Sequence, residues 1–90
     1  LDFTPPEYAK YPCLQLAYNA LHNGGAAPAI YNAANEVAVG RFLAKEISYL
    51  KIPRLIEHSL TLVNSPSNPS LDELLQIDAE TREVAQTHNP

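Results

Sequence analysis

The sequence predicts an all-α fold: a small helical bundle of three main helices and a capped fourth segment, preceded by an extended N-terminal lead-in. Two observations support this prediction. Prolines and glycines divide the 90 residues into intervals, and apolar residues in each interval recur with a helical period rather than in alternation. Apolar residues also make up 46% of the chain while glycine occurs only three times, which is typical of a globular helical domain. We expect residues 1–11 to be the lead-in and residues 12–87 to be the bundle.

The first helix is expected to follow the lead-in directly. Residues 1–11 contain adjacent prolines and no periodicity, which predicts extended backbone. Pro12 suits the opening turn of a helix, and Gly24 and Gly25 can adopt the left-handed conformation that ends one. The apolar side of this helix includes the only cysteine, Cys13, which we interpret as a small core residue.

The second helix, expected over residues 28–46, is apolar on nearly every side, as a central helix should be. Its cations, Arg41 and Lys45, lie on one narrow strip, which we expect to face water. Three polar residues project away from that strip: Asn32, Asn35 and Glu36. They are therefore expected to point inward or into a covered interface, where each must find a hydrogen-bond partner.

The third helix is expected over residues 53–63, because its apolar and polar residues separate cleanly onto opposite sides. The inward side is expected to carry Ile52, Leu55, Ile56, Ser59, Leu60 and Val63. Lys51 stands where an acidic cap would be expected, so the start of this helix is uncertain by a residue or two. Residues 64–70 (NSPSNPS) are typical of a short, stiff loop.

The fourth segment opens with a capping box, in which Ser70 and Glu73 each satisfy the other's free backbone amide. Asp78 interrupts the leucine stripe that follows, so it either caps a second short helix or bonds inward, and we favour the cap. Residues 86–90 are polar and are expected to fray.

Composition and motifs exclude several classes of function. A net charge of −4 disfavours a nucleic-acid partner, and no apolar run is long enough for a membrane span. A single cysteine and scattered histidines give no metal-ligand spacing, and we find no candidate catalytic, cofactor-binding or metal-binding residue. A lone carboxylate such as Glu36 has no evident chemical task, so we interpret the polar residues as structural contacts to loop backbone or a partner domain. The interdomain candidates are Asn32, Asn35, Glu36 and Asp78.

Three sequence blocks follow one another in an order that resembles a known family. They are YPCLQLAYNAL, GGAAPAIYNAANEVAVGRFL and SLDELLQIDAETREVA. The chain resembles, over nearly its whole length, the C-terminal helical domain of the 1-deoxy-D-xylulose 5-phosphate reductoisomerases.

The resemblance implies a larger cytoplasmic enzyme, bacterial or plastidic, of non-mevalonate isoprenoid biosynthesis. Such an enzyme converts 1-deoxy-D-xylulose 5-phosphate to 2-C-methyl-D-erythritol 4-phosphate with NADPH and a divalent cation, Mg²⁺ or Mn²⁺, and is typically a homodimer. None of the family's catalytic or cofactor motifs matches a position here, so the resemblance implies a structural domain that braces the catalytic domain of the same chain. The alternative is a free-standing adaptor that binds a partner's helix in a groove between the first two helices.

Overall fold

Four α-helices and one 3₁₀ turn account for the regular structure in residues 12–90, which are the residues that this computed structural model describes. The helices are α2 (Pro12–Asn23), α3 (Ala27–Leu43), α4 (Ile52–Leu62) and α5 (Leu71–Thr87), and the 3₁₀ turn η1 covers Tyr49–Lys51. This confirms the all-α prediction. The predicted lead-in lies outside the described residues, and so does the side chain of Cys13.

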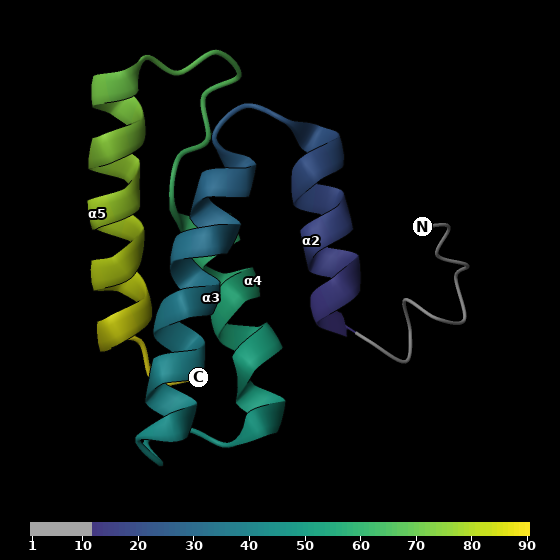
Figure 1. The fold of residues 1–90 in the computed structure, drawn as a ribbon, viewed down its shortest axis with the longest axis vertical. Coiled ribbons are helices and arrows are strands. Elements are labelled where there is room, and N and C mark those ends of the chain that lie inside the picture. Colours follow the sequence, from purple (N-terminus) through teal and green to yellow (C-terminus); the bar gives the residue numbers. More distant parts are fainter. Residues whose placement is uncertain (1–11) are drawn as a thin grey trace.

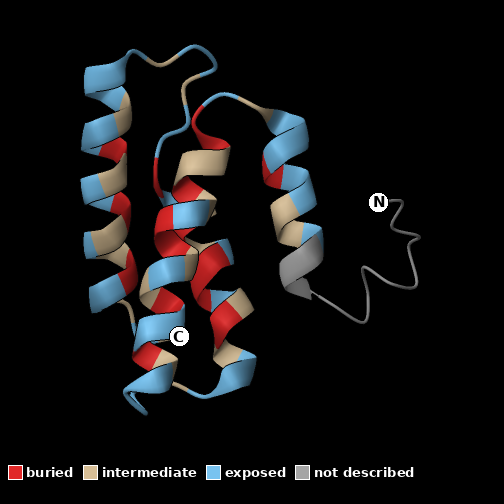
Figure 2. Cartoon of the chain, viewed as in Figure 1, coloured by how far each residue is buried: buried red, intermediate tan, exposed pale blue. Residues whose placement is uncertain are grey.

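The helices form an incomplete two-layer slab around α3. Figure 1 shows α3 between α5 and α2, with α4 behind it, and α3 contacts all three of these helices. The principal extents are 34 × 33 × 18 Å, so the molecule is thin in the direction of the view. Within residues 12–90 no helix covers one side of α3, and Figure 2 shows the exposed and half-buried residues along it.

The core is built from small residues on α3 and branched residues on α4. Alanines on α3 allow the neighbouring helices to approach closely, and the aliphatic side chains of α4 fill the space behind them. The central cluster comprises Ala34, Ala38, Ile52, Leu55, Ile56 and Ala85. A second cluster, nearer the α2–α3 turn, comprises Ala26, Ile30, Val63 and Ile77. The predicted inward side of the third helix is thereby confirmed.

The turn between α2 and α3 depends on its two glycines. Gly24 and Gly25 have φ angles of +70° and +59°, the left-handed region expected of them. A Cβ added to Gly25 would lie 2.5 Å from the backbone oxygen of Pro66 in the α4–α5 loop, whereas the space around Gly24 is open. The Ala26 amide donates to the same Pro66 oxygen at 3.2 Å. This contact joins two loops that are far apart in the sequence.

The central helix ends three residues earlier than predicted, in a Schellman motif. The amide of Glu46 donates to the carbonyl of Arg41 at 2.8 Å, and that of Lys45 donates to Phe42 at 3.0 Å. Lys45 takes the left-handed position of the motif, with φ +64°. Glycine normally occupies this position, so a lysine there does not indicate a helix end.

The start and continuity of α5 and the start of α4 were only partly predictable from the sequence. The capping box is confirmed: the hydroxyl of Ser70 accepts from the Glu73 amide at 3.2 Å, and the Ser70 amide donates to the Glu73 carboxylate at 3.0 Å. The suggested break at Asp78 is wrong, because α5 runs unbroken through it. The third helix, α4, follows η1 directly, and its N-cap residue Lys51 makes no side-chain capping hydrogen bond.

Candidate interdomain contact surface

Four side chains form a continuous polar cluster across α3 and α5. Asn32 and Glu36 lie one turn apart on α3, and the amide of Asn32 donates to the Glu36 carboxylate at 3.5 Å. The same carboxylate oxygen accepts from Arg82 Nη2 at 2.6 Å. Arg82 Nε donates to Asp78 at 2.9 Å, one turn back along α5. We call these four residues the α3–α5 polar cluster.

The cluster lies at the surface and is electrostatically satisfied. The side chains of Glu36, Arg82 and Asp78 are 56%, 41% and 40% exposed. The hydrogen bond to Asp78, followed by that to Glu36, raises the pKa of Arg82 above its ordinary value, so its positive charge is permanent. The cluster can therefore present a fixed set of hydrogen-bonding groups to another protein surface.

The prediction for the cationic strip of the central helix is wrong at Arg41, which was expected to face water and is only 8% exposed. Asn32 and Glu36 are exposed and Asn35 is half-buried, so Asn32 and Glu36 do not point into the core of the described residues, and their place in a covered interface stays a prediction. Lys45 is exposed as expected, although it lies beyond the end of α3. The error has a physical reason, because a helix that is apolar nearly all round gives no contrast from which to tell its inner side from its outer side.

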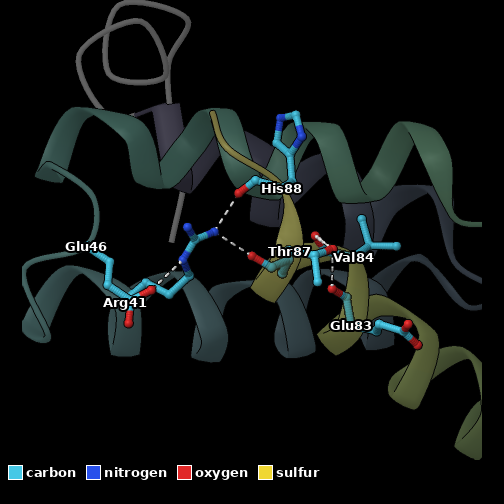
Figure 3. Close-up of polar contacts among 7 residues, drawn as sticks. Arg41, Glu46, Glu83, Val84, Thr87 and His88 are labelled. Carbon is cyan, nitrogen blue, oxygen red and sulfur yellow. Dashed lines mark hydrogen bonds and ion pairs between the residues drawn. The ribbon is translucent and has the colours of Figure 1, made fainter.

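Arg41 is buried because it closes the carboxyl end of α5. Figure 3 shows its guanidinium reaching the last turn of that helix, where Nη1 donates to the carbonyls of Ala85 at 2.8 Å and His88 at 2.6 Å. These groups carry the negative end of the helix dipole, so a cation is favoured there. Nε also pairs with Glu46 at 3.2 Å, beside the Schellman motif. A residue expected in solvent thus ties together the ends of α3 and α5.

The end of the chain is anchored rather than frayed, contrary to expectation. His88 stacks on His58 of α4 with ring centroids 3.5 Å apart and ring planes within 9°. Burial lowers the pKa of His88 below its ordinary value, and electrostatic interaction with His58 and Arg41 lowers it further. The ring is therefore neutral at physiological pH.

Asp78 takes neither of the two roles weighed from the sequence. It does not cap a second helix, and it bonds sideways to Arg82 instead of inward. The spacing of Asp78 and Arg82, four residues apart on a helix, was a readable signal for this pair. The bond between Arg82 and Glu36 joins residues that are 46 positions apart in the sequence, and no local pattern could have predicted it.

The described residues do not fit a metal centre. No three His, Cys, Asp or Glu side chains among them come together in a group that could hold a metal ion. No helix of the described part is long and apolar enough to cross a membrane. What the polar cluster offers is directional hydrogen bonding from a rigid two-helix platform. Fold and site together define a small all-α module of the kind that serves as a domain within a larger protein.

Comparison with known proteins identifies the family. The sequence model described as "DXP reductoisomerase C-terminal domain" matches residues 1–84, and the chain belongs to this family. It is 51% identical over 86 residues to the 1-deoxy-D-xylulose 5-phosphate reductoisomerase of Xanthomonas axonopodis pv. citri, covering 96% of this chain and 22% of that protein. It is 49% identical over 88 residues to the corresponding protein of Methylococcus capsulatus, again covering 22% of it.

A solved structure shares the fold. The Zymomonas mobilis 1-deoxy-D-xylulose 5-phosphate reductoisomerase, determined in complex with NADPH, superposes with a TM-score of 0.80 at 43% identity. The match covers 94% of this chain and 22% of that one. The present chain thus spans about a fifth of the length of the relatives it matches, and the resemblance found in its sequence is confirmed.

Proposed function

We propose that this domain is the structural C-terminal domain of a reductoisomerase and that it braces the catalytic domain of the same polypeptide. The larger protein would convert 1-deoxy-D-xylulose 5-phosphate to 2-C-methyl-D-erythritol 4-phosphate. It would use NADPH and a divalent cation, Mg²⁺ or Mn²⁺, and would act as a homodimer. Residues outside this domain would hold the cofactor and the cation, and the 90 residues alone would be inactive.

The observation that best supports a bracing role is the fixed geometry of the α3–α5 polar cluster. Arg82 connects Glu36 and Asp78 through bonds of 2.6 and 2.9 Å, so the carboxylates are held in place before any partner arrives. Groups that are already ordered lose less conformational entropy on contact, and a well-supported platform can hold neighbouring loops in the geometry that catalysis needs. Asn35, half-buried on α3, is the remaining interdomain candidate.

The test is mutation of the candidates in the full-length polypeptide. Glu36→Ala and Asn35→Ala should each lower the melting temperature or the turnover number while leaving the apparent KM for NADPH unchanged. Glu57→Ala, which removes the same charge from an exposed position on α4, is the matched control and should change neither. If both candidate variants keep the melting temperature and kinetics of the parent, the bracing role is wrong.

The adaptor alternative has one observation in its favour. A groove of about 220 Å³ lies between α2 and α3, lined by Ala17, Ala20, Leu21, Pro28, Tyr31 and Asn32. A free-standing adaptor would act without a larger polypeptide, so removing this domain from a reductoisomerase would leave the turnover of that enzyme unchanged. A bracing domain predicts that this removal abolishes or sharply reduces turnover.

A third possibility makes the 90-residue protein itself catalytic through Glu36. Its carboxylate already accepts bonds from Asn32 and Arg82, which leaves it poorly placed to act as a base. Incubating the 90-residue protein with NADPH, Mn²⁺ and 1-deoxy-D-xylulose 5-phosphate should give no NADPH oxidation.

A further inference from the structure

Two stripes of side chains run along the uncovered side of the slab with the same spacing. On α3 the stripe comprises the exposed residues Asn32, Glu36, Val39 and Leu43. On α5 it comprises Leu71, Leu75, Asp78 and Arg82, of which the leucines are exposed and the charged residues half-buried. Both stripes advance by four, three and four residues, which keeps them on one side of each helix. The helices α3 and α5 run in the same direction (Figure 1), and Arg82, the last residue of the α5 stripe, bonds to Glu36, the second residue of the α3 stripe, so the two stripes are joined in a staggered arrangement. Leu43 therefore lies toward one end of this surface, and Leu71 and Leu75 lie toward the other. We call these eight residues the front face.

The front face carries four of the nine large apolar residues that are exposed in the described part of the chain. On its buried side α3 has mainly alanine, whereas Leu43 on the front face is 72% exposed. On α5, Leu71 and Leu75 are 72% and 63% exposed. Large apolar residues are thus exposed on these helices, in addition to Ile30 and Ile77, which are buried in the core. Exposed apolar residues at both ends of a paired polar centre support a contact surface.

The polar centre of the front face is suited to being covered by protein. Its charged members, Glu36, Asp78 and Arg82, already neutralise one another at 2.6 and 2.9 Å. A partner that covers them does not have to supply a counter-charge for an isolated ion, which is the main penalty for burying charge. Paired polar groups flanked by leucines are the usual composition of a protein–protein interface, and the groove beside Leu21 and Asn32 extends the same surface to α2.

We infer that the front face is the surface on which the preceding part of the same polypeptide packs. This inference rests on the proposed function, and it identifies the surface through which bracing occurs. The relatives are about four to five times longer than this chain, and the family is a C-terminal domain, so a tethered partner is available. Tethering gives that partner a high effective concentration, so a patch of a few leucines around a paired polar centre is sufficient. Its matching surface should be apolar, with backbone groups facing the polar cluster.

The experiment introduces one cysteine at a time and compares the reactivity of the introduced cysteine in the full-length polypeptide and in the 90-residue protein. Leu43→Cys and Leu75→Cys report on the front face, and Leu62→Cys on α4 is the control, since Leu62 is 61% exposed and equally apolar. Maleimide labelling is followed peptide by peptide by mass spectrometry, and far-UV circular dichroism checks that each variant is folded. In the full-length polypeptide both front-face cysteines should react at least about tenfold more slowly than in the 90-residue protein, while the Leu62→Cys rate stays within about twofold.

Two outcomes would overturn the inference. Equal labelling of all three positions in both proteins would mean that the front face is not covered. If Asn35→Ala, which lies outside the front face, nevertheless lowers turnover, the bracing role would survive through another surface, so the two failures are distinguishable. Slow, concentration-dependent labelling of the front face in the 90-residue protein itself would mean that a second copy of the domain is the occupant instead.

Discussion

Replacing Arg41 by methionine should destabilise the domain strongly, although the sequence placed this residue in solvent. Methionine keeps most of the apolar stem and removes only the guanidinium. The bonds lost are the two to the carbonyls of Ala85 and His88, at 2.8 and 2.6 Å, and the pair with Glu46 at 3.2 Å. The two carbonyl bonds dominate the expected effect, because Glu46 is 48% exposed and an exposed ion pair contributes little.

The magnitude follows from the burial of these groups. A hydrogen bond to a charged group contributes about 1.5–3 kcal/mol, and two are lost. Removing a buried charge recovers part of this, because the guanidinium no longer has to be desolvated. We expect a net loss of about 2–4 kcal/mol for Arg41→Met, with Ala85 fully buried and its carbonyl left unpaired. For a domain of this size that corresponds to a fall in melting temperature of roughly 8–30 °C.

Urea unfolding of the 90-residue protein, followed by circular dichroism, measures the effect. The matched control is Glu46→Gln, which removes only the partner that is 48% exposed and should cost at most about 1 kcal/mol. Arg41→Lys should fall between the two, because an ammonium lacks the planar fork that reaches both carbonyls. A loss below about 0.5 kcal/mol in Arg41→Met, or one equal to that of Glu46→Gln, would refute the anchoring role.

Four further predictions concern the backbone and the chain end. Gly24→Ala should lose about 1–2 kcal/mol of stability, since its φ is positive, and Gly25→Ala at least twice as much, because its Cβ would also meet backbone. Lys45→Gly should stabilise the domain by about 1 kcal/mol by relieving its left-handed strain. Ser70→Ala should lose about 1 kcal/mol of helix-capping energy, and Ser70→Gly only a few tenths; thermal melts measure all of these. Because the pKa of His88 is lowered on folding, the unfolded chain binds protons more readily, so stability should be highest above pH 6.5 and fall as the pH drops through the lowered value. His88→Gln should flatten this dependence in urea titrations at several pH values, and an unchanged slope would count against it.

Local sequence signals predicted the elements well and their mutual orientation poorly. The helix count, the inward side of α4 and the Ser70 capping box each depend on residues within one or two turns of each other, and each is confirmed. The direction of the central helix depends instead on which neighbour each side meets. Arg41 is buried because it meets a helix end 44 residues away, and no local pattern carries that information.

The candidate site shows the same division between local and distant information. Asn32, Asn35, Glu36 and Asp78 remain interdomain candidates, since nothing within this domain tests that role. Their partner Arg82 was missed, although its spacing from Asp78 indicated a helical ion pair. The contact that makes the cluster continuous, from Arg82 to Glu36, exists only because α3 and α5 are neighbours in the fold.

The Arg41 anchor also bears on biosynthesis. A ribosome adds residues at roughly 5–20 per second, so about 2–9 s pass between the synthesis of Arg41 and that of Ala85 and His88, which accept its hydrogen bonds. During that interval α3 has been translated, but Arg41 has no helix end to bind and the alanine side of α3 has no α5 to pack against. Folding of this domain on the nascent chain should therefore wait until its last turn emerges, and a translational pause upstream of α5 would prolong the time for which its apolar surfaces are open to chaperones.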